Sequence, residues 1–203
     1  MKMEKYGFFG GSFNPVTKAH IELADEIVKK YGLDRVVFVP VGNCYIKEGL
    51  INEIHRYNML KIATRNYNML DVSDIELKQN KNLTTLEAFS KIEEKFKNID
   101  KYFIIGEDNL YKILESKDAE MLINNYKYIV IQRESLQIDN VIKKNKEILK
   151  NKDNFFMMEN KKHINTSSTK ARNEMLTSSK EVEKIVDKEV LNYIKENKLY
   201  SIC

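Results

Sequence analysis

One short segment of the sequence has residue types that suit the binding of a phosphate group. Residues 10–20 read GGSFNPVTKAH and follow an apolar run that ends at Phe9. Adjacent glycines let the backbone turn tightly and approach a ligand without a Cβ in the way. The N–H groups that open a following helix attract an anion, and His20 falls in the first turn of that helix. The glycines alone are equally compatible with an ordinary strand-to-helix turn.

Two cations lie in positions where they could neutralise phosphate charge. Lys47 is in a loop after the apolar residues 35–41, although a solvated loop lysine is the commoner reading of such a residue. Arg172 comes about one turn after Ser167 and Ser168, which are residue types that cap helices. Its planar donors match a phosphate, while the alternative is a capped helix with a surface arginine.

The elements that must position these residues alternate along the chain. Apolar strand-like runs span residues 6–9, 35–41, 69–75, 102–105, 128–132 and 155–158. Segments with helical spacing of apolar residues span residues 19–30, 54–64, 83–96, 168–176 and 181–195. This alternation predicts a parallel sheet with helices on both faces, which binds ligands at the carboxyl ends of its strands. The chain shows no repeat or linker, so we expect one domain.

The composition excludes several other classes of protein. Hydrophobic residues at 42% and charged residues at 32% describe an ordinary globular chain. The longest apolar stretches, such as residues 36–39, are far too short to span a membrane. Only two cysteines occur, and the N-terminus lacks the apolar core of a secretory signal, so we expect a cytoplasmic protein. The lysine-rich stretch 143–162 also holds acidic residues, which favours a solvated surface over a nucleic-acid site.

The glycine segment resembles the signature of the nucleotidylyltransferase superfamily, G-G-[ST]-F-[DN]-P-x-H-x-G-H. Thr17 stands where that signature has its first histidine, and Ala19 stands where it has its last glycine. The same threonine occurs in one branch, the nicotinate and nicotinamide mononucleotide adenylyltransferases, whose motif reads roughly G-S-F-N-P-[IV]-T-x-x-H. The departures therefore narrow the resemblance to that branch and leave His20 as the only motif histidine.

Three later segments resemble the same branch. They are residues 40–56 (PVGNCYIKEGLINEIHR), similar to P-V-G-[DN]-x-Y-x-K-x-G-L-[IL] followed by H-R; residues 104–110 (IIGEDNL), similar to [IL]-x-G-x-D-x-L; and residues 166–172 (TSSTKAR), similar to I-S-S-T-x-[IV]-R. The first of these is specific, because the related pantetheine-phosphate and glycerol-phosphate enzymes do not carry it. Within it we interpret His55 and Arg56 as structural. The resemblance covers nearly the whole chain.

The resemblance implies a Rossmann-like, doubly wound α/β fold with a parallel sheet of five to six strands and helices on both faces. We expect a single nucleotidyltransferase domain over residues 1–203, with a small C-terminal helical part from about residue 167. The implied reaction transfers the adenylyl group of ATP to nicotinate or nicotinamide mononucleotide and releases pyrophosphate. Such transfers need positioning and charge neutralisation more than covalent help. Mg²⁺ would arrive with ATP, and no residue cluster suggests a resident metal.

The resemblance also implies roles for individual residues. The catalytic candidates are His20, Lys47 and Arg172. The candidates for ATP and phosphate binding are Gly10, Gly11, Ser12, Phe13, Thr17, Gly106, Asp108, Ser167, Ser168 and Thr169. The candidates for mononucleotide binding are Asn14, Tyr45, Lys47, Thr85 and Tyr111. Partners would be ATP and a pyridine mononucleotide, with neither nucleic acid nor membrane, and a homo-oligomer stays open.

The acceptor is the least specified part of the expectation. Family members commonly place a tryptophan against the pyridine base, and this chain has no tryptophan. Tyr45 or Tyr111 would then supply the stacking, and Thr85 would supply a backbone contact to a nicotinate carboxylate. We expect nicotinate mononucleotide to be used, with some activity on the amide. Two alternatives stay open: a sister transferase with another phosphorylated acceptor, and a non-catalytic nucleotide sensor.

Overall fold

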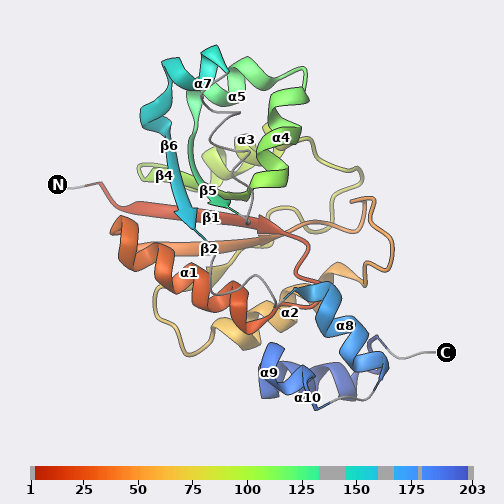
Figure 1. The fold of residues 1–203 in the computed structure, drawn as a ribbon. Helices are drawn as coiled ribbons and strands as arrows, with labels where there is room; N and C mark the ends of the chain where they lie inside the picture. Colours follow the sequence, from red (N-terminus) through yellow and green to blue (C-terminus); the bar gives the residue numbers. More distant parts are fainter. Residues whose placement is uncertain (1–2, 133–144, 160–166, 178–179, 201–203) are drawn as a thin grey trace.

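The computed structural model describes residues 3–132, 145–159, 167–177 and 180–200 (Figure 1). The strands are β1 (Lys5–Gly11), β2 (Arg35–Pro40), β3 (Leu70–Val72), β4 (Asp100–Gly106), β5 (Lys127–Gln132) and β6 (Phe155–Glu159). The helices are α1 (Lys18–Tyr31), α2 (Glu53–Thr64), α3 (Thr85–Lys95), α4 (Glu107–Glu115), α5 (Ala119–Asn125), α7 (Lys146–Lys150), the short 3-10 helix η1 (Lys152–Asn154), α8 (Ser168–Leu176), α9 (Val182–Ile185) and α10 (Lys188–Glu196).

The six strands form one sheet in the order β3-β2-β1-β4-β5-β6, and every neighbouring pair is parallel. This order and direction are those of the doubly wound Rossmann type. The expected α/β class, with a parallel sheet and helices on both faces, is therefore confirmed. The order reverses between β1 and β4, which lie side by side at the centre of the sheet.

Successive residues of the central strands supply two separate apolar cores, because neighbouring side chains in a strand point to opposite faces. Phe9 belongs to the core under α1, while Phe8 belongs to the core under α3 and α4. Ile104 and Phe103 divide between the two cores in the same way. A sheet that is buried on both faces explains why the sequence shows continuous apolar runs rather than alternation.

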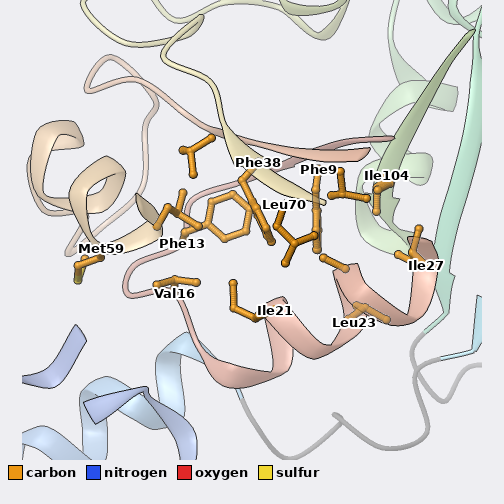
Figure 2. Close-up of a cluster of buried hydrophobic side chains, with 14 of the residues drawn as sticks. Phe9, Phe13, Val16, Ile21, Leu23, Ile27, Phe38, Met59, Leu70 and Ile104 are labelled. Carbon is orange, nitrogen blue, oxygen red and sulfur yellow. The ribbon is translucent and has the colours of Figure 1, made fainter. Parts of the chain in front are cut away.

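The first core also holds the C-terminal helices. Figure 2 shows Phe9, Phe38 and Ile104 from the sheet near Ile21 and Ile27 of α1. Apolar residues of α8 and α10 are buried in the same cluster: Ala171, Val190, Leu191 and Ile194. Helix α10 also packs on α2. In Figure 1 the C-terminal helices lie below α1, on the same side of the sheet.

The structure differs from the sequence prediction in one helix and adds others. The segment 181–195, expected as one helix, is the two helices α9 and α10. The break occurs at Asp187, whose carboxylate accepts from the backbone N–H of Glu189 and so caps a new helix. Helices α4 and α5 were not expected, and α7 lies within the lysine-rich stretch 143–162, part of which is outside the described residues. In the part of the chain that the structure describes, no helix has the length and apolar character to cross a membrane.

Candidate active site

The glycine segment lies at the point where the sheet reverses its order. Phe9 of β1 is in register with Ile104 of β4, so Gly11 and Gly106 follow at the same level, two residues further on. The chain then leaves β1 for α1 on one face of the sheet and leaves β4 for α4 on the other. Open α/β sheets bind ligands outside such a switch point.

The glycine loop, residues 10–17, has two glycines with different surroundings. A Cβ built on Gly11 would lie 2.9 to 3.2 Å from three atoms of the Phe13 ring, so packing of that ring requires a glycine there. A Cβ built on Gly10 would meet no protein atom within 4 Å. Nothing in the described chain therefore requires Gly10, and the space beside it is open.

Phe13 holds the loop to the core and supports His20. Its φ of 43° is in the left-handed region, which a bulky residue adopts only when its surroundings impose it. The buried Phe13 ring packs edge-on against Phe38, with centroids 5.4 Å apart, and against His20, at 5.2 Å. The side chain expected at the ATP site is thus part of the core, and only the backbone of Phe13 is left to face a nucleotide.

His20 is oriented by the start of its own helix. Thr17 is the N-cap of α1, and its backbone N–H donates to His20 Nδ1 at 3.0 Å, while Thr17 Oγ1 lies 2.8 Å from the same nitrogen. Because Nδ1 accepts, the neutral imidazole carries its proton on Nε2. The buried Thr17 side chain therefore serves the histidine and the helix cap.

Lys47 reaches the glycine loop from the next crossover. Residues 41–51, here called the lysine loop, follow β2, and Lys47 Nζ donates to Ser12 Oγ at 2.9 Å. The first residue of the lysine loop is tied to the same place, since Val41 N–H donates to Gly11 O at 3.1 Å. The structure thus brings together Ser12 and Lys47, which a helix and a strand separate in the sequence.

Arg56 fastens both ends of the lysine loop to the glycine loop. This arginine is 0% exposed and gives all its bonds to carbonyls: Nη2 to Val41 O at 2.6 Å, Nε to Ile51 O at 3.0 Å and Nη1 to Ser12 O at 3.0 Å. Burial lowers the pKa of its guanidinium, while Glu53 acts most strongly against that shift. The structural role expected for Arg56 is confirmed, but no local sequence pattern shows its three partners.

Arg172 contacts the glycine loop from the far end of the chain. Its Nη1 donates to Asn14 O at 2.7 Å, and its Nη2 donates to Thr169 Oγ1 at 3.3 Å. Ser167 caps α8 by accepting from Lys170 N–H at 3.1 Å, and Ser168 Oγ donates to Pro15 O at 2.8 Å. The N-terminus of α8 is therefore fixed beside the glycine loop. Thr166, the first residue of this motif, is outside the described residues.

The side chain of Asn14, expected to bind the mononucleotide, is used inside the protein. Asn14 is 0% exposed; its Nδ2 donates to Gly49 O at 2.7 Å, and its Oδ1 accepts from Ile51 N–H at 3.4 Å and from the Tyr200 hydroxyl at 2.8 Å. Tyr200 is a site residue that the sequence did not indicate. Its signal there is that residues 190–200, which end in this tyrosine, also resemble the closing segment of the family.

The remaining predicted residues lie around the carboxyl edge of the sheet. Gly106 is the N-cap of α4, and a Cβ there would lie 2.6 Å from Asp108 Oδ1, so the glycine lets the carboxylate fold back over the helix start. Tyr111 is half-buried on the same helix, and Tyr45 is half-buried in the lysine loop. Thr85 is the exposed first residue of α3, which Thr84 caps. Among the hydrogen bonds of the described residues, none joins these five residues to the glycine loop.

Within the described residues, no group of three or more His, Cys, Asp or Glu side chains could hold a metal ion.

Comparison with known proteins gives consistent results. The cytidylyltransferase-like family model matches residues 8–174. The chain is 29% identical over 202 residues to a probable nicotinate-nucleotide adenylyltransferase of Clostridium tetani, covering 98% of this chain and 100% of that one. It is 31% identical to the protein of the same description from Clostridium novyi, over 85% of this chain and 88% of that one. A solved structure of Plasmodium falciparum nicotinic acid mononucleotide adenylyltransferase, complexed with NaAD, matches with a TM-score of 0.79 and 25% identity over 97% of each chain.

Proposed function

Because the chain belongs to the cytidylyltransferase-like family, and within it to the nicotinate-nucleotide adenylyltransferases, we propose that it transfers the adenylyl group of ATP to nicotinate mononucleotide. The products are the dinucleotide NaAD and pyrophosphate. The observation that carries this proposal is the meeting of Lys47 and Arg172, from distant segments, on the glycine loop. Two cations at the switch point of the sheet suit a reaction between two phosphate groups.

The reaction is one displacement at phosphorus. An oxygen of the mononucleotide's 5′-phosphate attacks the α-phosphorus of ATP, a new P–O bond forms, and the bond to the bridging oxygen of pyrophosphate breaks. No covalent enzyme intermediate is needed, so the protein's work is to align both phosphates and to stabilise developing negative charge.

His20 is proposed to donate to the α-phosphate of ATP. Thr17 N–H donates to Nδ1, so the neutral ring carries its proton on Nε2, the atom that would face the phosphate. The ring is held on its other side by Phe13, at a centroid distance of 5.2 Å. A donor fixed in this way needs little reorganisation as charge builds up on the phosphate oxygen.

Lys47 and Arg172 are proposed to neutralise the phosphates. Lys47 lies on the lysine loop, from which its ammonium group would bind the mononucleotide phosphate and the leaving pyrophosphate. Arg172 and the first N–H groups of α8, beyond Ser167, Ser168 and Thr169, would hold the triphosphate. Gly10, Gly11 and Ser12 would let the triphosphate approach the backbone, and Gly106 with Asp108 would receive the ribose hydroxyls.

The pyridine base is proposed to lie between the lysine loop and α3. Thr85 is the first residue of α3, where backbone N–H groups have no intrahelical acceptor, so its N–H suits the nicotinate carboxylate. Tyr45 or Tyr111 would supply the aromatic surface that a tryptophan supplies in other members. Asn14 would act on the mononucleotide through the loop that it holds. Nicotinamide mononucleotide, which lacks the negative charge, would be used less well.

ATP would enter with Mg²⁺ bound to its phosphates, and a cytoplasmic location is proposed because both substrates are intracellular nucleotides. Bound Mg²⁺ would draw charge from the phosphates. Lys47 and Arg172 would add to that neutralisation from the protein side.

The proposal is tested by measuring pyrophosphate release from ATP with a panel of acceptors. The panel contains nicotinate mononucleotide, nicotinamide mononucleotide, phosphopantetheine and glycerol 3-phosphate. We expect the highest kcat/KM with nicotinate mononucleotide and a lower value with the amide. Pyrophosphate release only with phosphopantetheine or glycerol 3-phosphate would show that the acceptor is not a pyridine mononucleotide. If the protein bound ATP but released no pyrophosphate with any acceptor, it would be a nucleotide sensor and not an enzyme.

A further inference from the structure

Near the end of the described residues, one hydroxyl group contacts the site. Tyr200, four residues beyond α10, donates from its hydroxyl to Asn14 Oδ1 at 2.8 Å. Asn14 is 0% exposed, so water cannot replace this partner. Burial raises the pKa of the Tyr200 phenol, which keeps the hydroxyl protonated and able to donate.

Both ends of the Asn14 amide bind the lysine loop. Asn14 Nδ2 donates to Gly49 O at 2.7 Å, and Ile51 N–H donates back to Asn14 Oδ1 at 3.4 Å. The turn between these bonds and Lys47 is closed by Leu50 N–H, which donates to Lys47 O at 3.3 Å. The position of Lys47 therefore depends on the orientation of the Asn14 amide.

An amide with one hydrogen bond fewer has more freedom to rotate. Gly49 O and Ile51 N–H set which end of the amide is which, and the Tyr200 hydroxyl adds the shorter of the two hydrogen bonds to Oδ1, at 2.8 Å against 3.4 Å. Arg172 fixes the backbone of Asn14 by its bond to the carbonyl oxygen, but it does not contact the amide. Without the Tyr200 hydroxyl, the longer bond from Ile51 would be left to hold Oδ1.

We infer that Tyr200 is a positioning residue for the reaction: through Asn14 it holds the lysine loop so that Lys47 meets the acceptor's phosphate. The expected effect on the kinetics rests on the proposed function. The effect should be larger on the acceptor than on ATP, because the contacts of His20 and Arg172 do not pass through the Asn14 amide.

The test compares Tyr200→Phe with Tyr193→Phe. The first variant keeps the ring and removes the hydroxyl that Asn14 accepts. The second also removes a tyrosine hydroxyl of the C-terminal region, but that hydroxyl is bonded to His55 Nδ1 at 2.9 Å and Asn58 Nδ2 at 3.0 Å, both on α2. Tyr193→Phe is therefore the matched control for a loss of stability without a loss of loop position.

Two measurements are made on each full-length variant. In kinetics, Tyr200→Phe should raise KM for nicotinate mononucleotide about 3- to 10-fold, the factor that corresponds to one lost hydrogen bond, and leave KM for ATP nearly unchanged. In the ligand-free protein, amide hydrogen exchange of residues 45–51 should become several-fold faster. Tyr193→Phe should change neither quantity, although it lowers Tm.

A double variant tests whether the effect passes through Lys47. If it does, Lys47→Ala with Tyr200→Phe should lose little more activity than Lys47→Ala alone. Multiplicative losses in the double variant would overturn the inference. So would unchanged KM values and unchanged loop exchange in Tyr200→Phe, even if Tm fell. If the wild-type protein made no dinucleotide, the proposed function would fail, while faster loop exchange in Tyr200→Phe alone would still support the tie to the lysine loop.

Discussion

His20 takes the place that a Glu or Gln usually has in a capping box. It is the third residue of α1, and it accepts from the backbone N–H of its own N-cap, Thr17. A carboxylate in that position would satisfy the N–H equally well but would repel a phosphate. An imidazole satisfies it with one nitrogen and keeps a proton on the other, so one residue serves both the helix and the anion.

Replacing His20 by Ala should reduce kcat far more than it raises KM for ATP. The expected loss in kcat is about 10²–10³-fold, because the donor is needed mainly while charge develops on the α-phosphate. Steady-state kinetics with both substrates varied would measure this, with circular dichroism to verify the fold. A variant with near-normal turnover would remove His20 from the catalytic residues.

Arg172 should not be replaceable by lysine. Its guanidinium bridges Asn14 O and Thr169 Oγ1 at the same time, and a single ammonium cannot reproduce that planar geometry. Arg172→Lys should therefore weaken ATP binding and turnover substantially, by about tenfold or more for one lost charge-assisted bond. ATP affinity by calorimetry and kcat should both be measured for the Lys and Ala variants. A silent Arg172→Lys would make the residue an ordinary surface arginine.

The sequence predicted which residues come together at the site better than it predicted which of their side chains are buried. His20, Lys47 and Arg172 were informative because they occur within motifs that match one family in the same order, although each alone is compatible with an ordinary surface residue. Asn14 and Phe13 belong to the same motif, yet their side chains are buried and serve the chain itself. Burial of this kind depends on partners far away in sequence, such as Tyr200, and local patterns do not contain them.

At the scale of elements, the glycine loop separates two uses of glycine. Gly11 permits packing, because a Cβ would collide with the Phe13 ring, whereas Gly10 faces open space. Gly11→Ala should therefore lower Tm, since Phe13 must move from its place in the core. Gly10→Ala should keep the Tm of the wild type but weaken ATP binding, because the added methyl group occupies the ligand's side of the loop.

Thermal unfolding and ATP titration of the two variants would separate these effects. Equal losses of Tm in both variants would contradict the distinction. A Gly10→Ala protein that binds ATP normally would show that the backbone at Gly10 does not approach the nucleotide.

Some elements were predicted almost as they occur, and others were missed. The strands β2 and β5 and the helix α8 were expected almost as they occur, since buried runs and capping serines mark them. Helix α5 and the break between α9 and α10 escaped prediction. In the second case Asp187 lies inside the segment 181–195 that the spacing predicts as one helix, although its carboxylate caps a new one.

At the scale of the whole molecule, a set of buried charges joins three crossovers of the fold. Arg56 of α2 binds carbonyls of the glycine loop and the lysine loop. Glu53, on the same helix, accepts from Asn43 N–H at 2.6 Å and from Lys78 N–H at 2.8 Å, which adds the segment after β3. Glu76 lies in that segment, close to Arg56. The site is thus held by polar contacts under its loops as well as by the apolar cores.

This arrangement makes the stability of the protein depend on the protonation of Glu76. Burial raises the pKa of the Glu76 carboxyl from 4.5 to about 7, and the nearby charge of Arg56 only partly opposes the shift. The folded protein therefore holds this proton more tightly than the unfolded chain does. The corresponding stability is fully present below about pH 4.5 and is lost as the pH rises through about 7.

Replacing Glu76 by Gln removes the titrating group and should remove this loss. The variant should gain stability relative to the wild type between pH 5 and pH 8, by up to about 3 kcal/mol for a shift of this size. Urea unfolding of both proteins at the two pH values measures the difference, and Glu94→Gln, on the exposed side of α3, is the control that should show no such gain. If the free energy of unfolding of Glu76→Gln differed from that of the wild type by the same amount at both pH values, the carboxyl would ionise in the folded protein without a loss of stability. The charge of Arg56 would then compensate fully for the ionised Glu76 carboxylate, and the contacts under the loops of the site would be equally stable at pH 5 and pH 8.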